Sequence, residues 1–153
     1  WQQQLEDHKQ AFAQEFVSRP RFTGAYPASL TAAEFVNQLN RNAGGVLNDA
    51  DLAQLEAIFG GPNAPSADVA KRAEAVRSLA ENQTLQQSEF DRAFVLMQYF
   101  AYLRRNPDDA QDTDYTGYDF WLRKLDQFGG NYLNAEMVKA FVSSLEYRQR
   151  FGQ

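Results

Sequence analysis

The side chains best suited to chemistry lie in an acidic stretch, residues 108–117. Oxygen-bearing side chains alternate there, and a glycine that permits a sharp turn follows, as in the first half of an EF-hand calcium loop. The second half fails, because Arg123 stands where a bidentate glutamate is required. A looser calcium site is therefore one hypothesis. Its candidate ligands are Asp108, Asp112, Asp114 and Thr116.

The alternative for the same stretch is a solvated acidic turn, and we favour it. Asp114 or Thr116 would then cap the next helix, and Gly117 would allow close packing under Trp121. Aspartates serve as caps and turn residues more often than as metal ligands.

The familiar catalytic sets are missing from the sequence. Without cysteine, the chain forms no disulfide, thiolate nucleophile or thiolate metal site. His8 is the only histidine, and its register with neighbouring apolar residues predicts a position at the edge of the core. No nucleophile-elbow or phosphate-loop motif is present. We predict that the protein is not an enzyme and needs no cofactor, calcium excepted. A carboxylate-pair glycan hydrolase is the enzymatic alternative.

Charge and hydropathy restrict the partners. The net charge is −5, and no window is rich in lysine and arginine on one face, which argues against nucleic acid. We interpret Arg104 and Arg105 as a helix C-terminus, where the helix dipole favours cations. The longest dense apolar run, Phe94 to Leu103, is too short to span a bilayer. The chain begins at Trp1 without a signal-peptide pattern, so we expect a processed protein or an excerpt of a longer one.

Hydrophobic periodicity predicts an all-α fold, a compact multi-helix domain of about seven helices. Thr31 and Glu34 form a capping box, Asn48 is a second cap, and Ser66, Ser88 and Asn134 are further candidate helix starts. Pro20 ends or bends the first helix. The expected helices cover roughly residues 1–19, 31–43, 48–59, 66–80, 88–105, 116–128 and 134–145.

A faint internal repeat suggests how these helices are organised. Residues 76–79 (Val-Arg-Ser-Leu) echo residues 142–145 (Val-Ser-Ser-Leu), and Gly-Gly pairs occur at 60–61 and 129–130. One account is a duplicated helical unit around one shared core; the other is chance similarity among amphipathic helices. We therefore expect a single all-helical domain over 1–153, with a degenerate first unit at 1–90 and a second unit at 91–153.

The last sixty or so residues carry a specific motif order. An apolar helix is followed by an Arg-x-Pro-Asp signature, an Asp-x-x-Gly turn, a Phe-Trp pair and a final Ser-x-Glu-Tyr. This order resembles a bacterial domain-of-unknown-function family, number forty-two fourteen. The loop at 109–112 is longer than in that family's pattern. The matching residues are Tyr102, Leu103, Arg105, Pro107, Asp108, Asp114, Gly117, Phe120, Trp121, Leu125, Ser144, Glu146 and Tyr147.

The resemblance implies an all-helical module similar in outline to the linker domains of cyanobacterial antenna complexes. It also implies an extracellular or cell-surface location, within large exported proteins, and no catalytic residue. Our leading hypothesis is a non-enzymatic module for protein–protein interaction or structural assembly, with protein partners or a homo-oligomer. The alternative is a calcium-dependent binding or adhesion module that uses the acidic loop.

Overall fold

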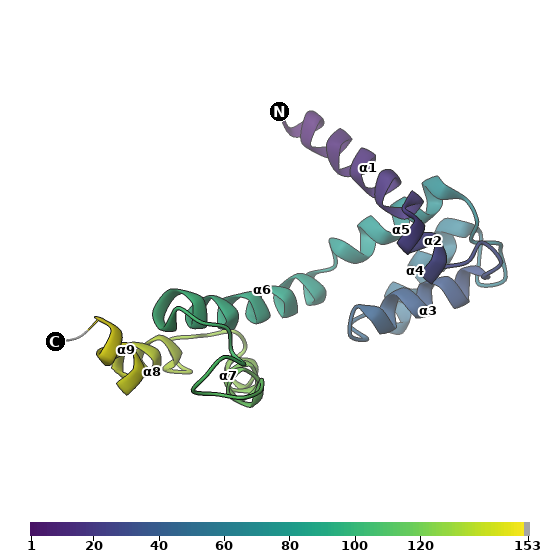
Figure 1. Ribbon diagram of the computed structural model, residues 1–153. Helices are drawn as coiled ribbons and strands as arrows, with labels where there is room; N and C mark the ends of the chain where they lie inside the picture. The colour runs from purple at the N-terminus through teal and green to yellow at the C-terminus, as the bar shows by residue number, and fades with distance from the viewer. Residues whose placement is uncertain (152–153) are drawn as a thin grey trace. The chain divides into compact units, whose positions relative to one another are not determined.

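The computed structural model describes residues 1–151. This part of the chain is all-helical and contains no β-strand, so the predicted fold class is confirmed (Figure 1). No helix in it is both long and apolar enough to cross a membrane. The elements are α1 (Gln2–Ser18), α2 (Pro20–Ala25), α3 (Ala32–Asn42), α4 (Asp49–Phe59), α5 (Val69–Ala80), α6 (Gln83–Gln98), the π-helix η1 (Tyr99–Leu103), α7 (Thr116–Gln127), α8 (Met137–Ser143) and α9 (Leu145–Phe151).

The chain divides into two compact units, Trp1–Gln86 and Gln87–Gln153. Each unit has its own cluster of buried apolar residues within the described range, where we expected one shared core. The dividing point lies inside α6. The expected boundary between the two units, at residues 90 and 91, lies four residues further along the same helix, and no glycine or proline marks the division.

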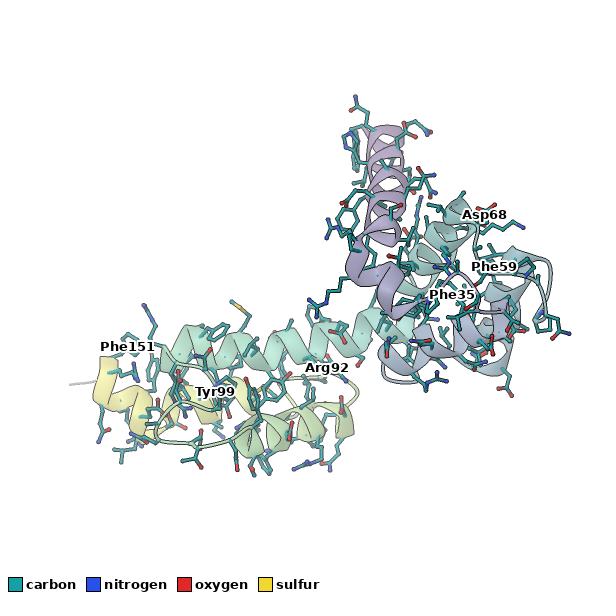
Figure 2. All side chains as sticks on the ribbon, turned by 45° about the vertical axis from the view of Figure 1, so that its right-hand side comes forward. Phe35, Phe59, Asp68, Arg92, Tyr99 and Phe151 are labelled. Carbon is teal, nitrogen blue, oxygen red and sulfur yellow. The ribbon has the colours of Figure 1, made fainter. Side chains whose placement is uncertain are left out.

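Unit 1 packs its core around aromatic rings. Phe35, which is fully buried, lies 5.6 Å from Phe59 and 5.4 Å from Tyr26, measured between ring centroids (Figure 2). Both predicted caps are present: Thr31 and Glu34 form a reciprocal capping box at α3, and Asn48 begins α4. These caps satisfy backbone N–H groups that a helix start leaves free.

The first helix differs from its predicted orientation. Pro20 interrupts it and becomes the first residue of α2, because proline suits a helix start but not a helix interior. Ala13 and Val17 of α1 are buried, whereas Phe12 is 61% exposed. His8 is also exposed, so its predicted place at the core edge is wrong. The buried side of α1 is lined by small residues, which hydrophobic periodicity alone underweights.

Local hydrogen bonds shift three predicted helix starts. α6 begins before Ser88 because the Asn82 side chain accepts the Thr84 and Leu85 N–H groups. Ser66 is buried and donates its hydroxyl to Leu30 O (2.8 Å), which leaves Asp68 to cap α5. At the C-terminal end, α8 begins at Met137 and not directly after Asn134. Extended backbone at Ser144 then separates α8 from α9.

Candidate functional site: an arginine-centred cleft in unit 2

Unit 2 contains a cleft of about 250 Å³ that combines aromatic and charged side chains. Its walls come from η1, the acidic loop, α7, α8 and the start of α9. These segments are distant in sequence, and the cleft therefore exists only in the folded unit. The lining residues are Tyr99, Leu103, Arg105, Asp112, Gly117, Trp121, Ala140, Phe141, Ser144 and Glu146.

Arg105 is the centre of the cleft's charge network. Its Nε donates to Glu146 Oε1 (2.8 Å), and its Nη2 donates to Glu146 Oε2 (3.1 Å) and to Asp112 Oδ2 (2.7 Å). Nη1 donates to the backbone carbonyls of Asn106, Pro107 and Asp109. All three guanidinium nitrogens are thus engaged within the chain. The side chain is only 7% exposed.

Local backbone geometry directs Arg105 into this position. Arg104 adopts a left-handed conformation with φ 54°, which ends η1. Pro107 is fully buried and fixes the following turn. The loop then folds around the guanidinium, because three of its carbonyls accept hydrogen bonds from it. The sequence prediction that Arg104 and Arg105 mark a helix C-terminus is confirmed, but Arg105 also organises the loop that follows.

Glu146 reaches the cleft because Ser144 breaks the last helical segment. The Ser144 hydroxyl donates to Phe141 O (2.7 Å) and accepts the Tyr147 N–H (3.1 Å), so it ends α8 and caps α9. The carboxylate of Glu146 then makes a two-pronged contact with Arg105 across 41 positions of sequence. Such bidentate pairs fix orientation as well as charge.

Tyr99 supplies the aromatic floor of the cleft. The Arg105 guanidinium carbon lies 5.3 Å from its ring centroid, and Phe141 packs edge-on at 5.1 Å. Figure 2 shows the tyrosine on the side of the chain that faces the shorter helices of unit 2. Burial raises the pKa of the Tyr99 hydroxyl to about 12; the Asp112 charge adds to this effect, and Arg105 opposes it.

Gly117 is required by close approach. It lies inside α7, and its φ is not positive. A Cβ at this position would instead stand 2.8 Å from the Tyr99 hydroxyl oxygen. Trp121, which we expected to cover Gly117, is half-buried and packs 5.6 Å from Phe141 between ring centroids.

The structure does not bring the four predicted calcium ligands together. Asp112 binds Arg105, Asp114 Oδ1 accepts the Thr116 N–H (2.8 Å), and Asp108 is exposed. In residues 1–151 no group of three or more histidine, cysteine, aspartate or glutamate side chains is placed to hold a metal ion. Asp114 thus acts at the start of α7, as the acidic-turn interpretation predicts.

The pairing of Arg105 with Glu146 was not deduced from residue types. The signal available in the sequence was the motif order, since both residues belong to the pattern that resembles the family. Without that pattern, an arginine near a helix end and a glutamate on a short amphipathic segment look like ordinary surface residues.

Chemically, the cleft is a satisfied ion-pair network beside aromatic side chains. Two carboxylates, Asp112 and Glu146, do converge in it, which is the arrangement that a glycan hydrolase requires. Both carboxylates accept hydrogen bonds from the same guanidinium, whereas glycoside hydrolysis needs one carboxyl group positioned to donate a proton to the substrate. The contacts of Asp112 and Glu146 with Arg105 hold distant chain segments together, and this arrangement suits a structural role better than proton transfer to a substrate.

The chain matches no family model, no curated protein and no solved structure. The resemblance noted in the sequence therefore stays a prediction that depends on its motif residues.

Proposed function

We propose that this chain is a non-enzymatic helical module that contacts other proteins, including copies of itself, in a structural assembly. The observation that carries this proposal is the number of large apolar side chains that remain exposed on the surface of both units. Soluble monomeric proteins rarely expose large contiguous apolar patches, and such patches often mark interaction sites. The most exposed examples are Trp1 at 85%, Phe12 at 61%, Phe90 at 62%, Met97 at 55%, Leu133 at 70% and Leu145 at 68%.

The state of the charged cleft also supports a structural role. Arg105 has its donors engaged by Glu146, Asp112 and the loop backbone. A ligand that used this arginine would have to displace a contact that holds unit 2 together. The proposed export to the cell surface has a different basis: it depends on the resemblance alone, and we put it forward as part of the same hypothesis.

Light scattering coupled to size separation tests the proposal. The purified chain is run over a hundredfold range of concentration, with calcium and with a chelator. Mass that rises with concentration supports assembly. A monomer at every concentration that also binds no cell-envelope protein in a pull-down contradicts the proposed function.

A glycan hydrolase is the second candidate, because Asp112 and Glu146 share a cleft with Tyr99 and Trp121. A panel of polysaccharides is incubated with wild-type protein and with the variant Asp112→Asn. Turnover by the wild type that the variant lacks would support an enzyme. Equal absence of products, with both proteins folded by circular dichroism, would remove this candidate.

The calcium hypothesis is tested separately by thermal unfolding. If the acidic loop binds the ion, millimolar calcium raises the melting temperature of the wild type but not that of the double variant Asp112→Ala, Asp114→Ala. If the loop is an acidic turn, calcium shifts neither protein.

A further inference from the structure

One side of α6 carries large apolar side chains that nothing in residues 87–151 covers. Asp91, Val95 and Gln98 are buried on the side that faces the rest of the unit. On the adjacent, solvent-facing side of the helix, Phe90 is 62% and Met97 is 55% exposed. In both views, α7 and α8 lie along one side of α6 only (Figures 1 and 2).

The exposed surface continues beyond α6. Phe90 stacks on Phe94, with ring centroids 6.2 Å apart, and Phe94 lies 5.1 Å from Tyr132. Tyr132 is 41% exposed, and its neighbour Leu133 is 70% exposed. We call this surface the α6 face; it consists of Phe90, Ala93, Phe94, Met97, Tyr132 and Leu133.

The α6 face contains no charged side chain. Of the charged residues nearest to it on the helix, Asp91 is buried, and Glu89 and Arg92 bond to each other at 3.0 Å. Aromatic side chains bury roughly 150–250 Å² each, so the face exposes on the order of 400 Å² of apolar area. Two copies of it would bury roughly 800 Å², which is less than the ~1,000 Å² of a stable interface and fits a weak, concentration-dependent pair.

We infer that the α6 face binds the same face of a second copy, with the two α6 helices antiparallel and the two-fold axis between Ala93 and Phe94. This inference deepens the proposed function by naming its surface and its partner. The spacing is self-complementary: Phe90 lies three residues before Ala93, and Met97 lies three residues after Phe94. An antiparallel pair therefore sets Phe90 of each copy against Met97 of the other.

The side-chain types suit this geometry. Ala93 is exposed and small, so it lets the two helices approach closely at the crossing point. Methionine sulfur packs favourably against aromatic rings, which both ends of the interface would then use. A two-fold interface must be complementary to itself, and an uncharged face meets that condition without like-charge repulsion.

Cysteine cross-linking tests the pairing directly, because the natural chain has no cysteine. A disulfide needs Cα atoms within about 7 Å, which only residues near the axis satisfy. The full chain carrying Ala93→Cys is oxidised with copper–phenanthroline. The matched control is Ala11→Cys, at an exposed alanine of α1 in unit 1. We expect the 93 variant to cross-link at least about tenfold faster, since pairing raises the local thiol concentration.

A mixed experiment tests the register. Phe90→Cys and Met97→Cys proteins, distinguished by a mass tag, are oxidised together. The antiparallel arrangement predicts more mixed dimer than either protein forms with itself. Equal yields of all three products would overturn this register.

A charge variant completes the test. Ala93→Glu should lower the dimer fraction in light scattering at least about tenfold, because it places two carboxylates at the axis. Ala11→Glu should leave that fraction unchanged, and circular dichroism confirms that both variants are folded.

The outcomes separate this inference from the proposed function. If the wild type assembles but Ala93→Cys and Ala11→Cys cross-link equally, the α6 face is wrong and the assembly role stands. If the wild type is monomeric at every concentration, self-pairing is overturned. The proposed function is then judged by binding of envelope proteins alone.

Discussion

Each unit contains a buried arginine that joins distant chain segments, but the two arginines are satisfied differently. In unit 1, Arg72 is 4% exposed and donates to the backbone carbonyls of Tyr26, Pro27 and Ser66. In unit 2, Arg105 donates to carbonyls and to two carboxylates. Both guanidiniums lie over an aromatic ring, Arg72 at 4.9 Å from the Phe35 centroid.

The difference shows two ways to bury a cation. Burial lowers the pKa of the Arg72 guanidinium, since among residues 1–151 it forms no ion pair. The hydrogen bonds that the Arg105 guanidinium donates to Glu146 raise its pKa, and the bond that it donates to Asp112 adds to this rise against the effect of burial. Carbonyl dipoles are enough to hold a charge inside unit 1, whereas unit 2 uses formal charges that depend on one another.

The largest effect is expected from Arg105→Met. Removing the guanidinium leaves Glu146, whose side chain is 12% exposed, with only a 3.7 Å ion pair to Arg150, and the loss of a buried partner destabilises by about 3–5 kcal/mol. Urea unfolding followed by Trp121 fluorescence, in a Trp1→Phe background, measures this in unit 2. The double variant Arg105→Met, Glu146→Leu should recover part of the loss. If the double variant were no more stable than Arg105→Met, the Glu146 carboxylate would not be the cause of the destabilisation.

A smaller effect is expected from Arg72→Met. Three carbonyls lose their donor, but no charge is stranded, so we expect about 2–3 kcal/mol. Hydrogen exchange of the α3 amides reports the loss within unit 1. Arg72→Lys should recover little, because an ammonium group cannot reproduce the fork of the guanidinium. If Arg72→Met lowered the free energy of unfolding as much as Arg105→Met, the proposed difference between a carbonyl-bound and a carboxylate-bound arginine would be wrong.

Gly117→Ala probes the packing that supports Arg105. The added Cβ meets the Tyr99 hydroxyl, which is 2.8 Å away, and overpacking of this kind costs about 1–3 kcal/mol. Thermal or urea unfolding measures the change. Tyr99→Phe removes the obstructing oxygen, so the double variant should be less destabilised than the sum of the single variants. If the destabilisation of the double variant equalled the sum of the two single variants, a direct clash between the added Cβ and the Tyr99 hydroxyl would be contradicted.

The smallest effect is expected from alkaline pH. Below pH 10, Tyr99 is neutral in the folded and unfolded chain alike, and its burial has no pH-dependent cost. Between pH 10 and about 12 the unfolded chain ionises first, so folded stability falls as pH rises. Tyr99→Phe should flatten this part of the stability profile. Phenolate absorbance near 295 nm checks the ionisation, and a Tyr99 that titrates with the unfolded chain would refute it.

Much of the local structure was predictable from the sequence. The capping box at Thr31 and the cap at Asn48 follow from side chains that bond to backbone three positions away or less. The burial of α1 was not predictable, because Leu5 and Phe12 are exposed while Ala13 and Val17 face the core and Phe16 is only partly buried. The roles of Ser66 and Asn82 were missed for a related reason: several polar residues near each start were equally good caps by type.

The sequence by itself determined the helical class, two of the caps and the acidic-turn role of Asp114, since all of these arise within a few residues of chain. Only the tertiary structure decided that there are two cores and that Arg105 binds Glu146. It also decided that Gly117 is needed for its closeness to Tyr99 and not for its backbone angle. These features depend on distances between segments far apart in the chain, which residue type and spacing do not encode.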